Sequence, residues 1–175
     1  AFRLLSDTFR SGGKLLVCGN GGSAADSEHI AGELNKSFRL RRPLREDLKR
    51  RLQAACDDGG LLADRLQEGL PTLSLVNALA LGTAFANDVD PELVYAQQVL
   101  VHGRAGDTLL GISTSGNARN VLQAMKVARV LGLATLGLTG ETGGRLVPHC
   151  DVLVRVPETE TYLVQELHFP IYHAL

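Results

Sequence analysis

The segment that most constrains the fold of this chain is the stretch of residues 15–34. A short apolar run at 15–18 stops at the sequence Gly-Asn-Gly-Gly-Ser of residues 19–23, and a helix-compatible segment follows, with Ser23 or Asp26 placed to cap it. Glycines let a backbone approach a ligand closely, and a helix start presents free N–H groups at the positive end of a dipole. The stretch therefore predicts a strand, an anion-binding turn and a helix, as α/β proteins use them.

The rest of the chain repeats this alternation of short apolar runs and amphipathic segments. Further strands are predicted at 72–76, 108–112, 134–138 and 152–156, and helices at 2–9, 77–86, 92–101, 118–131 and 161–175. The sequence Asn-Asp-Val-Asp-Pro at 87–91 is predicted to break the helical pattern, because a residue before proline disfavours the α conformation. The alternation predicts an α/β fold with a doubly wound parallel sheet whose carboxyl-end loops form the binding site.

Residues 39–69 differ in character from the rest. Seven arginines and lysines lie between 39 and 51, against two acidic residues, and leucines at helical spacing predict one or two amphipathic helices around residues 57–60. The basic run is interpreted either as a solvated helix face or loop, or as a surface that meets an anion or another subunit.

Length, charge and cysteine content narrow the class of protein. The 175 residues suit a single domain with a sizeable core. A formal net charge of −1 gives no global attraction to nucleic acid or to a membrane surface, and no apolar run approaches the ~20 residues of a transmembrane helix. Three cysteines without a CxxC pair favour reduced thiols. We therefore expect a cytoplasmic protein with no nucleic-acid and no membrane partner.

A second binding loop is predicted at Ser113-Thr114-Ser115-Gly116-Asn117, between a strand and a helix. Three hydroxyls beside the N–H groups of a helix start form a neutral, donor-rich nest for a phosphate. Ordinary capping of the helix is the alternative, but one cap needs only one hydroxyl. The chain lacks both G-x-x-x-x-G-K-[ST] and, at residues 19–22, the spacing G-x-G-x-x-G, so the donors suit a sugar phosphate better than a nucleotide.

A group of polar side chains at the two ends of the chain points to acid–base chemistry. His29 and Glu33 lie four residues apart, on one face of the first-loop helix, where they can bind a metal or supply a ligand and a base. Gln165 and His173 lie on the last helix, separated by about 12 Å if that helix is regular. Pro170 is predicted to disturb this helix. His168 competes with these residues as a ligand, whereas His102 and His149 are predicted to be surface residues.

Four motifs in order resemble the phosphoheptose isomerases (sedoheptulose-7-phosphate isomerases) of the sugar isomerase (SIS) domain superfamily. They are C-G-N-G-G-S-x-x-D-x-x-H-x-x-x-E at 18–33, the Asn-Asp pair at 87–88, L-L-G-I-S-T-S-G-N at 109–117 and Q-E-x-H-x-x-x-x-H at 165–173. The resemblance covers nearly the whole chain except residues 39–69. It implies a flavodoxin-like three-layer αβα sandwich with a five-stranded parallel sheet, a single SIS domain over residues 1–175 that carries a basic helical insertion at about 39–69.

The resemblance also implies an activity and an assembly. Members convert sedoheptulose 7-phosphate to D-glycero-D-manno-heptose 7-phosphate, an aldose–ketose isomerisation through an enediol that leads toward the heptose of lipopolysaccharide. They are homotetramers with active sites at subunit interfaces. Carried over by position, Glu33 is the base and His173 the acid. Substrate binding falls to Asn20, Gly21, Gly22, Glu33, Asn87, Asp88, Ser113, Thr114, Ser115 and Gln165.

A zinc ion is implied for members that carry one, with His29, Glu33, Gln165 and His173 around it. Three features depart from the family pattern: Ala118 in place of a phosphate-loop serine, the long insertion, and Pro170. Two alternatives stay open, namely a non-catalytic SIS-domain regulatory protein of the kind that associates with the replication initiator DnaA, and an isomerase of another sugar phosphate. The set of four acid–base and ligand residues favours catalysis, because a binding module has no need of it.

Overall fold

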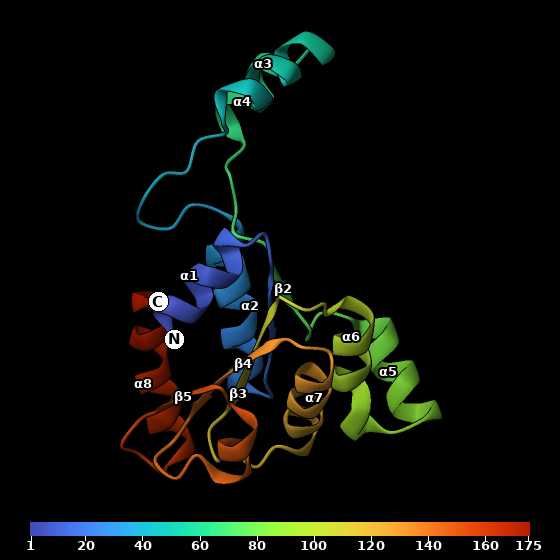
Figure 1. The fold of residues 1–175 in the computed structure, drawn as a ribbon, viewed down its shortest axis with the longest axis vertical. Helices are drawn as coiled ribbons and strands as arrows, with labels where there is room; N and C mark the ends of the chain where they lie inside the picture. The colour runs from blue at the N-terminus through green and yellow to red at the C-terminus, as the bar shows by residue number, and fades with distance from the viewer.

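The computed structural model describes all residues 1–175 and contains one five-stranded sheet between two layers of helices (Figure 1). All neighbouring strands are parallel, in the order β2-β1-β3-β4-β5. The strands are β1 Leu15–Cys18, β2 Thr72–Ser74, β3 Thr108–Ser113, β4 Ala134–Thr139 and β5 Val152–Arg155. The predicted α/β fold with a five-stranded parallel sheet is confirmed, with strand ends that differ from the predicted ones by one or two residues.

The central strands are buried on both faces, which explains why they read as continuous apolar runs rather than as an alternation. Every residue of β1 and of β3 is buried. Leu15 pairs with Thr72 on one side and with Thr108 on the other, so β1 is a middle strand of the sheet. The edge strand β5 is only half-buried.

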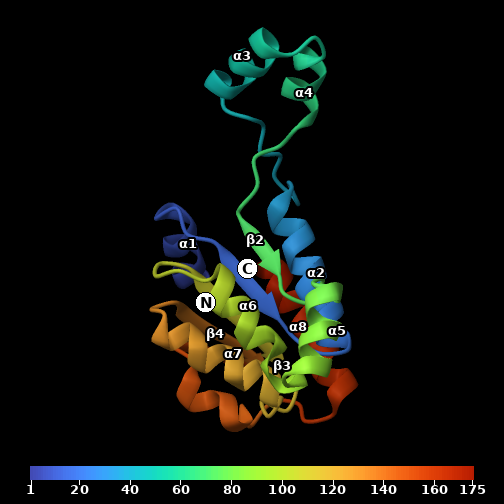
Figure 2. The same cartoon turned by 90° about the vertical axis from the view of Figure 1, so that its right-hand side faces the viewer.

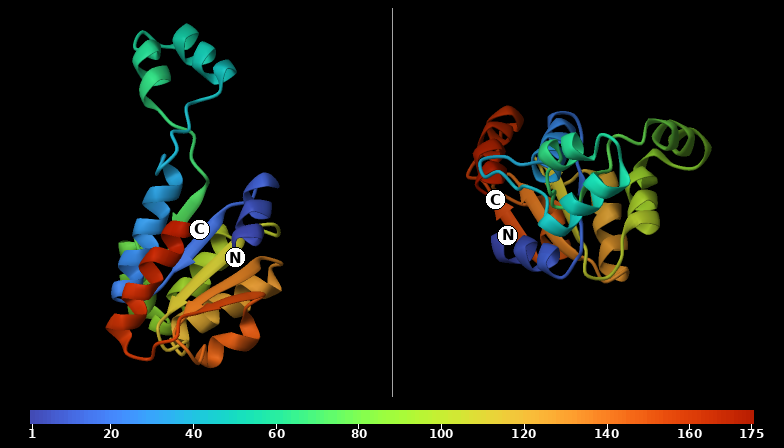
Figure 3. Two further views of the ribbon diagram at one scale, coloured as in Figure 1. Left: turned by 90° about the vertical axis from the view of Figure 1, so that its left-hand side faces the viewer. Right: turned by 90° about the horizontal axis from the view of Figure 1, so that it is seen from above.

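Three helices cover one face of the sheet: α1 Phe2–Arg10, α2 Gly22–Asn35 and α8 Thr161–Ala174 (Figure 3). On the opposite face lie α6 Val94–His102 and α7 Arg119–Val130, together with the 3-10 helix η2 Gly144–His149 (Figure 2). Each face has its own apolar core, built on Leu15, Val17 and Ile112 under α2 and on Leu16 and Leu109 packed with Met125 of α7. No helix is both long enough and apolar enough to cross a membrane.

The remaining helices lie outside these two layers. Helix α5 Leu79–Asp88 and the 3-10 helix η1 Pro91–Leu93 flank α6. Helices α3 Glu46–Ala55 and α4 Gly59–Arg65 form an arm that extends away from the sheet and contact mainly each other (Figures 1 and 3). The amphipathic helices predicted within residues 39–69 are therefore present, and α3 buries none of its side chains in the chain.

Three local predictions are wrong. Neither Ser23 nor Asp26 caps α2, because the N-cap residue is Gly21, whose φ of +56° turns the chain, and no side chain makes a cap hydrogen bond. Asn87 and Asp88 belong to α5 rather than to a break, because the carbonyl of Phe85 accepts from two later amides and prolongs the helix. Helix α8 runs on through Pro170.

Asp107 fastens the start of β3 to the start of β1. Its buried carboxylate accepts hydrogen bonds from the Lys14 and Arg104 backbone N–H groups, each at 2.9 Å, and from Lys14 Nζ at 2.5 Å. Asp107→Ala is expected to lower the free energy of unfolding by about 3 kcal/mol, because it removes three hydrogen bonds to a buried carboxylate. Urea denaturation measures this. The exposed Asp7→Ala is the matched control, with a change within about 0.5 kcal/mol; an equal loss in both variants would contradict the assignment.

Candidate active site

The sheet order places a crevice at the carboxyl ends of β1 and β3. The connection after β1 passes through α2 on one face of the sheet, and the connection after β3 passes through α7 on the other. Loops that leave a parallel sheet toward opposite faces part at such a point, and ligands of α/β proteins bind there. Both predicted binding loops, residues 19–23 and 113–117, lie at this edge.

The loop after β1 is held from two sides. Tyr95 on α6 donates its hydroxyl to the Gly19 carbonyl at 2.5 Å, and burial raises the pKa of Tyr95 to about 12, with a smaller contribution from Cys18. Asn20 exchanges two side-chain hydrogen bonds of 2.9 Å with Asn120 in the first turn of α7. Tyr95 and Asn120 were not predicted from the sequence. Their contacts fix the position of Asn20 beside the loop after β3.

The loop after β3 combines accessible hydroxyls with a braced backbone. Ser113 is buried and accepts from the Ala118 N–H at 3.4 Å, whereas Ser115 is exposed. The Gly140 N–H bonds to the Thr114 carbonyl at 2.9 Å, and the Leu146 N–H to the Gly116 carbonyl at 3.0 Å, so the next loop supports this one. Ala118 precedes α7 without a side-chain cap, which leaves N–H groups of the helix start available to an anion.

Gln165 meets this edge of the sheet from α8. Its side-chain amide lies so close to Gly22 that a Cβ there would clash with Nε2 of Gln165. The structure thus brings together two residues that are predicted to bind substrate and lie far apart in the sequence. Gly22 has no positive φ, so an added Cβ there would act by displacing the Gln165 amide rather than by straining the backbone.

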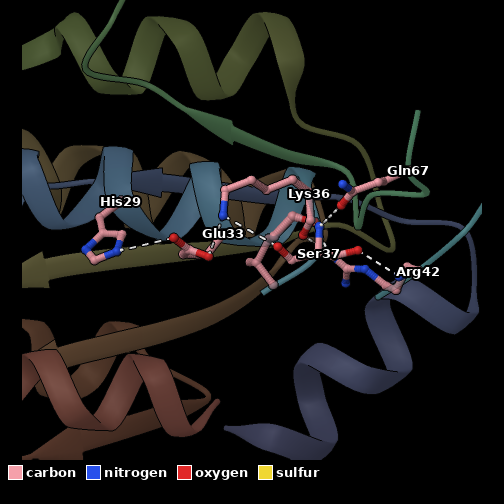
Figure 4. A network of polar contacts seen from close by, with 7 residues as sticks. His29, Glu33, Lys36, Ser37, Arg42 and Gln67 are labelled. Atoms are coloured by element: carbon pink, nitrogen blue, oxygen red, sulfur yellow. Dashed lines mark hydrogen bonds and ion pairs between the residues drawn. The ribbon is translucent and has the colours of Figure 1, made fainter. Parts of the chain in front are cut away.

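A second polar group lies farther along α2 and α8, which contact each other. His29 Nε2 lies 3.6 Å from Glu33 Oε1, and the other carboxylate oxygen of Glu33 lies 2.9 Å from Lys36 Nζ (Figure 4). The hydrogen bond from Lys36 is the main cause that lowers the pKa of Glu33, and the positive charges of Lys36, His29 and His173 add to it. Glu33 is therefore held in its ionised form, as a general base requires.

His173 completes this group. Its ring centroid lies 5.0 Å from that of His29 and 4.2 Å from that of Phe169, both in edge-on arrangements. The Nε2 atom of His173 is buried and has no hydrogen-bond partner within the chain. A buried imidazole nitrogen without a partner is costly, and a ligand can supply the missing contact.

Glu33 and His173 line the same apolar groove, which has a volume of about 560 Å³. The groove runs between α1, the end of α2 and the end of α8, and it reaches the base of the arm at Phe38 and Leu40. A carboxylate and an imidazole in one largely apolar groove are shielded from part of the solvent, which strengthens their action on a bound molecule.

The predicted site residues therefore fall into two groups. Asn20, Gly22, Gln165 and residues 113–115 lie at the carboxyl edge of the sheet, and His29, Glu33 and His173 lie together about two helical turns away, since Gln165 and His173 are separated by about 12 Å along α8. Asn87 and Asp88 belong to neither group. At the end of α5 the Asn87 side chain donates to the Asp88 carboxylate at 2.8 Å, and neither side chain bonds to another residue.

The other histidines are not part of either group. His168, predicted to compete as a ligand, is completely buried, and both its ring nitrogens lack a side-chain partner. Burial lowers the pKa of His168, opposed by the Thr139 backbone and by the charge of Asp26. His102 is exposed and His149 half-buried.

The residues named for zinc do not fit a metal ion in this arrangement. No group of three or more His, Cys, Asp or Glu side chains is placed to hold one. Lys36 occupies one oxygen of Glu33, and Gln165 lies at Gly22 rather than beside His173.

Comparison with known proteins identifies relatives that cover most of the chain. A family model described as SIS domain matches residues 1–57 and 52–140. A phosphoheptose isomerase of Roseiflexus sp. (strain RS-1) is 42% identical over 169 residues, which cover 97% of this chain and 73% of the relative.

Solved structures of the same kind share the fold. Phosphoheptose isomerase from Neisseria gonorrhoeae superposes with a TM-score of 0.78 at 34% identity, and one from Francisella tularensis with a TM-score of 0.80 at 30% identity. Each comparison covers 98% of this chain and 78% of the solved chain. The chain therefore belongs to the phosphoheptose isomerases of the SIS domain family.

Proposed function

We propose that this protein is an aldose–ketose isomerase that converts sedoheptulose 7-phosphate to D-glycero-D-manno-heptose 7-phosphate. The observation that carries the proposal is the placement of Glu33 and His173 in one groove. The loops suited to phosphate lie at the other end of the same pair of helices. An extended seven-carbon sugar phosphate has its reacting carbons and its phosphate at opposite ends, as this elongated arrangement requires.

The reaction moves one proton between neighbouring carbons. Glu33 takes a proton from C1 of the ketose while His173 donates one to the C2 carbonyl oxygen, which gives an enediol. The protonated Glu33 then returns a proton to C2, and His173 takes back the proton of the C1 hydroxyl, which becomes the aldehyde. Both side chains end in their starting protonation states, so the cycle closes without any other reactant.

Binding of the phosphate positions the reacting end of the sugar. The hydroxyls of Ser113, Thr114 and Ser115 and the free N–H groups at the start of α7 are the proposed phosphate donors. Asn20 and Gln165 are the proposed contacts to sugar hydroxyls. Interactions with the remote phosphate orient the substrate at Glu33, which is how binding energy lowers a barrier without taking part in the chemistry.

The proposal also covers the location of the protein, its assembly and the use of its product. We propose a cytoplasmic homotetramer with sites at subunit interfaces, whose product supplies heptose for lipopolysaccharide. Exposed apolar side chains support an assembly of subunits: Leu79 on α5 is 78% exposed and Leu40 at the base of the arm 82% exposed.

Incubation with sedoheptulose 7-phosphate in heavy water tests the function. We expect an aldose product whose C2 carries deuterium, because the proton on Glu33 exchanges with solvent before it is returned. Proton NMR detects both the aldehyde and the label. Absence of any product from this substrate and from shorter ketose phosphates would contradict the proposal and favour a regulatory SIS protein.

Lys36→Met is expected to shift the acid limb of the kcat/KM profile to higher pH. The hydrogen bond from Lys36 is the main cause that lowers the Glu33 pKa, so its removal raises that pKa. A base works in its deprotonated form, and activity is lost as the pH falls through its pKa; a higher pKa therefore starts the loss at higher pH. Lys126→Met on α7 is the matched control. A limb that stays in place or moves to lower pH would contradict Glu33 as the base.

A further inference from the structure

The side chains of Asn20 and Asn120 join the loop after β1 to the first turn of α7. Asn20 Nδ2 donates to Asn120 Oδ1 at 2.9 Å, and Asn120 Nδ2 donates to Asn20 Oδ1 at 2.9 Å. Asn120 lies outside all four motifs that resemble the phosphoheptose isomerases. The pair is therefore a direct link between the first predicted binding loop and the helix that follows the second, and no motif assigns it a role.

A backbone hydrogen bond fixes the direction in which both carboxamides point. The Val121 N–H donates to Asn120 Oδ1 at 2.9 Å. A backbone N–H is only a donor, so the side-chain atom that meets it must be the oxygen of Asn120 and not its nitrogen. The Asn120 nitrogen then faces Asn20 and supplies a hydrogen, so the atom of Asn20 opposite it must be the oxygen. The orientation of Asn20 thus follows from one N–H group of α7.

The hydrogens that remain show what Asn20 offers to a ligand. Its Nδ2 atom carries two hydrogens, and one of them is donated to Asn120. The other has no partner within the chain, and Asn20 is exposed to solvent. The Asn20 oxygen is turned toward Asn120 and toward Tyr95, whose hydroxyl lies 3.5 Å away. Asn20 therefore presents a hydrogen-bond donor at the carboxyl edge of the sheet, which suits an oxygen atom of a sugar.

We propose that Asn120 is a positioning residue that holds the Asn20 carboxamide with this donor directed at the substrate. The consequence for catalysis rests on the proposed function. The proposed phosphate donors include the N–H groups at the start of α7, and Asn120 belongs to the first turn of that helix. One rigid element therefore sets the position of the phosphate and the position of the Asn20 donor. A sugar phosphate of matching length meets both without having to order a mobile side chain.

The exposure of the pair separates this role from a structural one. Asn20 is exposed and Asn120 is half-buried. Water can replace a lost partner at such a position, so removal of the pair costs little stability. The orientation of Asn20, by contrast, matters each time a substrate binds. We therefore expect Asn120→Ala to leave the fold intact, to release the Asn20 side chain and to lower turnover.

Relaxation of the side-chain nitrogen of Asn20 tests the positioning role without any sugar. The full chain is labelled with ¹⁵N-asparagine, and Asn20→Ala assigns the signal. We expect an Asn20 Nδ2 order parameter of about 0.8 in the unaltered chain, close to that of a rigid backbone, and a value below about 0.6 in Asn120→Ala. Gln123→Ala, at a half-buried position in the next turn of α7, is the matched control and should leave the order parameter and the activity unchanged.

A double-mutant cycle tests the consequence for turnover. Asn120→Ala is expected to lower kcat/KM for sedoheptulose 7-phosphate about tenfold. In a chain that already carries Asn20→Ala, the same substitution should lower kcat/KM less than twofold, because Asn120 acts through Asn20. A residue with a merely structural role would lower kcat/KM by the same factor in both backgrounds.

The outcomes separate this inference from the proposed function. If the Asn20 side chain is as mobile in the unaltered chain as in Asn120→Ala, or if Asn120→Ala lowers kcat/KM equally in both backgrounds, the role of Asn120 is overturned. If the order parameter falls as expected but no sugar phosphate is isomerised, the positioning role stands and the proposed function fails. Circular dichroism and a thermal melt confirm that each variant is folded before the measurements are compared.

Discussion

Glu33→Gln is expected to lower kcat for isomerisation by about 10³-fold, which lies within the usual contribution of a positioned general base. The amide has nearly the same shape as the carboxylate, but it cannot accept a proton from carbon. His29 Nε2 at 3.6 Å and Lys36 Nζ at 2.9 Å are the polar neighbours of this side chain, and both side chains are partly exposed to solvent. We therefore expect KM to change little and the fold to stay intact.

Purified protein, steady-state kinetics and a deuterium-exchange assay measure this effect. Glu28→Gln, an exposed glutamate on the same helix, is the matched control and should keep full activity. The exchange assay adds a distinct readout, because a chain without its base should also fail to incorporate deuterium at C2. Turnover of the Gln variant within tenfold of the unaltered chain would remove Glu33 from the mechanism.

The sheet could be predicted from the sequence because its strands are buried on both faces. Short apolar runs such as 108–113 and 134–139 are typical of strands in the middle of a covered parallel sheet, and the glycine turns mark where they end. The same local reasoning fails where tertiary contacts decide. The Phe85 carbonyl accepts hydrogen bonds from two later backbone N–H groups, and α5 therefore continues through Asn87 and Asp88. The proline at 91 had predicted a break there.

The composition of the site could be predicted, but its layout could not. His29 and Glu33 are neighbours by helical spacing alone, and their closeness follows from the sequence. The support of the first loop by Tyr95 and Asn120 joins positions 76 and 100 residues apart, which no local spacing reveals. The separation of Gln165 from His173 along α8 follows from their spacing in the sequence. Which residues of α2 each of them meets depends on the packing of α2 beside α8, which the spacing does not reveal.

The placement of the arm, helices α3 and α4, could not be predicted from the sequence either. Leucines at helical spacing predict α3 and α4, but the sequence does not say that these helices leave the body of the protein (Figure 1). The base of the arm, at residues 37–42 and 67, is nevertheless joined to the candidate site by hydrogen bonds. The Ser37 N–H bonds to Gln67 at 2.8 Å, and the Ser37 hydroxyl accepts from the Arg42 N–H at 2.7 Å (Figure 4). Lys36, the partner of Glu33, directly precedes Ser37. The hydrogen bonds at the base of the arm therefore hold in place the residue that keeps Glu33 ionised.

Gly116→Ala is expected to destabilise the protein by about 3 kcal/mol and to weaken binding of the sugar phosphate. Gly116 has a φ of +67°, where a side chain costs about 1 kcal/mol. A Cβ there would also clash with the carbonyl oxygen of Gly143. That oxygen belongs to backbone and cannot rotate aside, so the loop after β3 must move away from the loop that supports it.

Two measurements on this variant bear on the fold and on the function separately. Urea denaturation reports the loss of stability, and Gly60→Ala, where an added Cβ meets nothing within 4 Å, is the control, with a change within about 1 kcal/mol. The KM for sedoheptulose 7-phosphate reports the loop at Ser113–Ser115, and we expect it to rise at least tenfold. An unchanged KM in a chain that has lost stability would show that this loop does not hold the phosphate, because the displaced N–H groups and hydroxyls are the proposed donors.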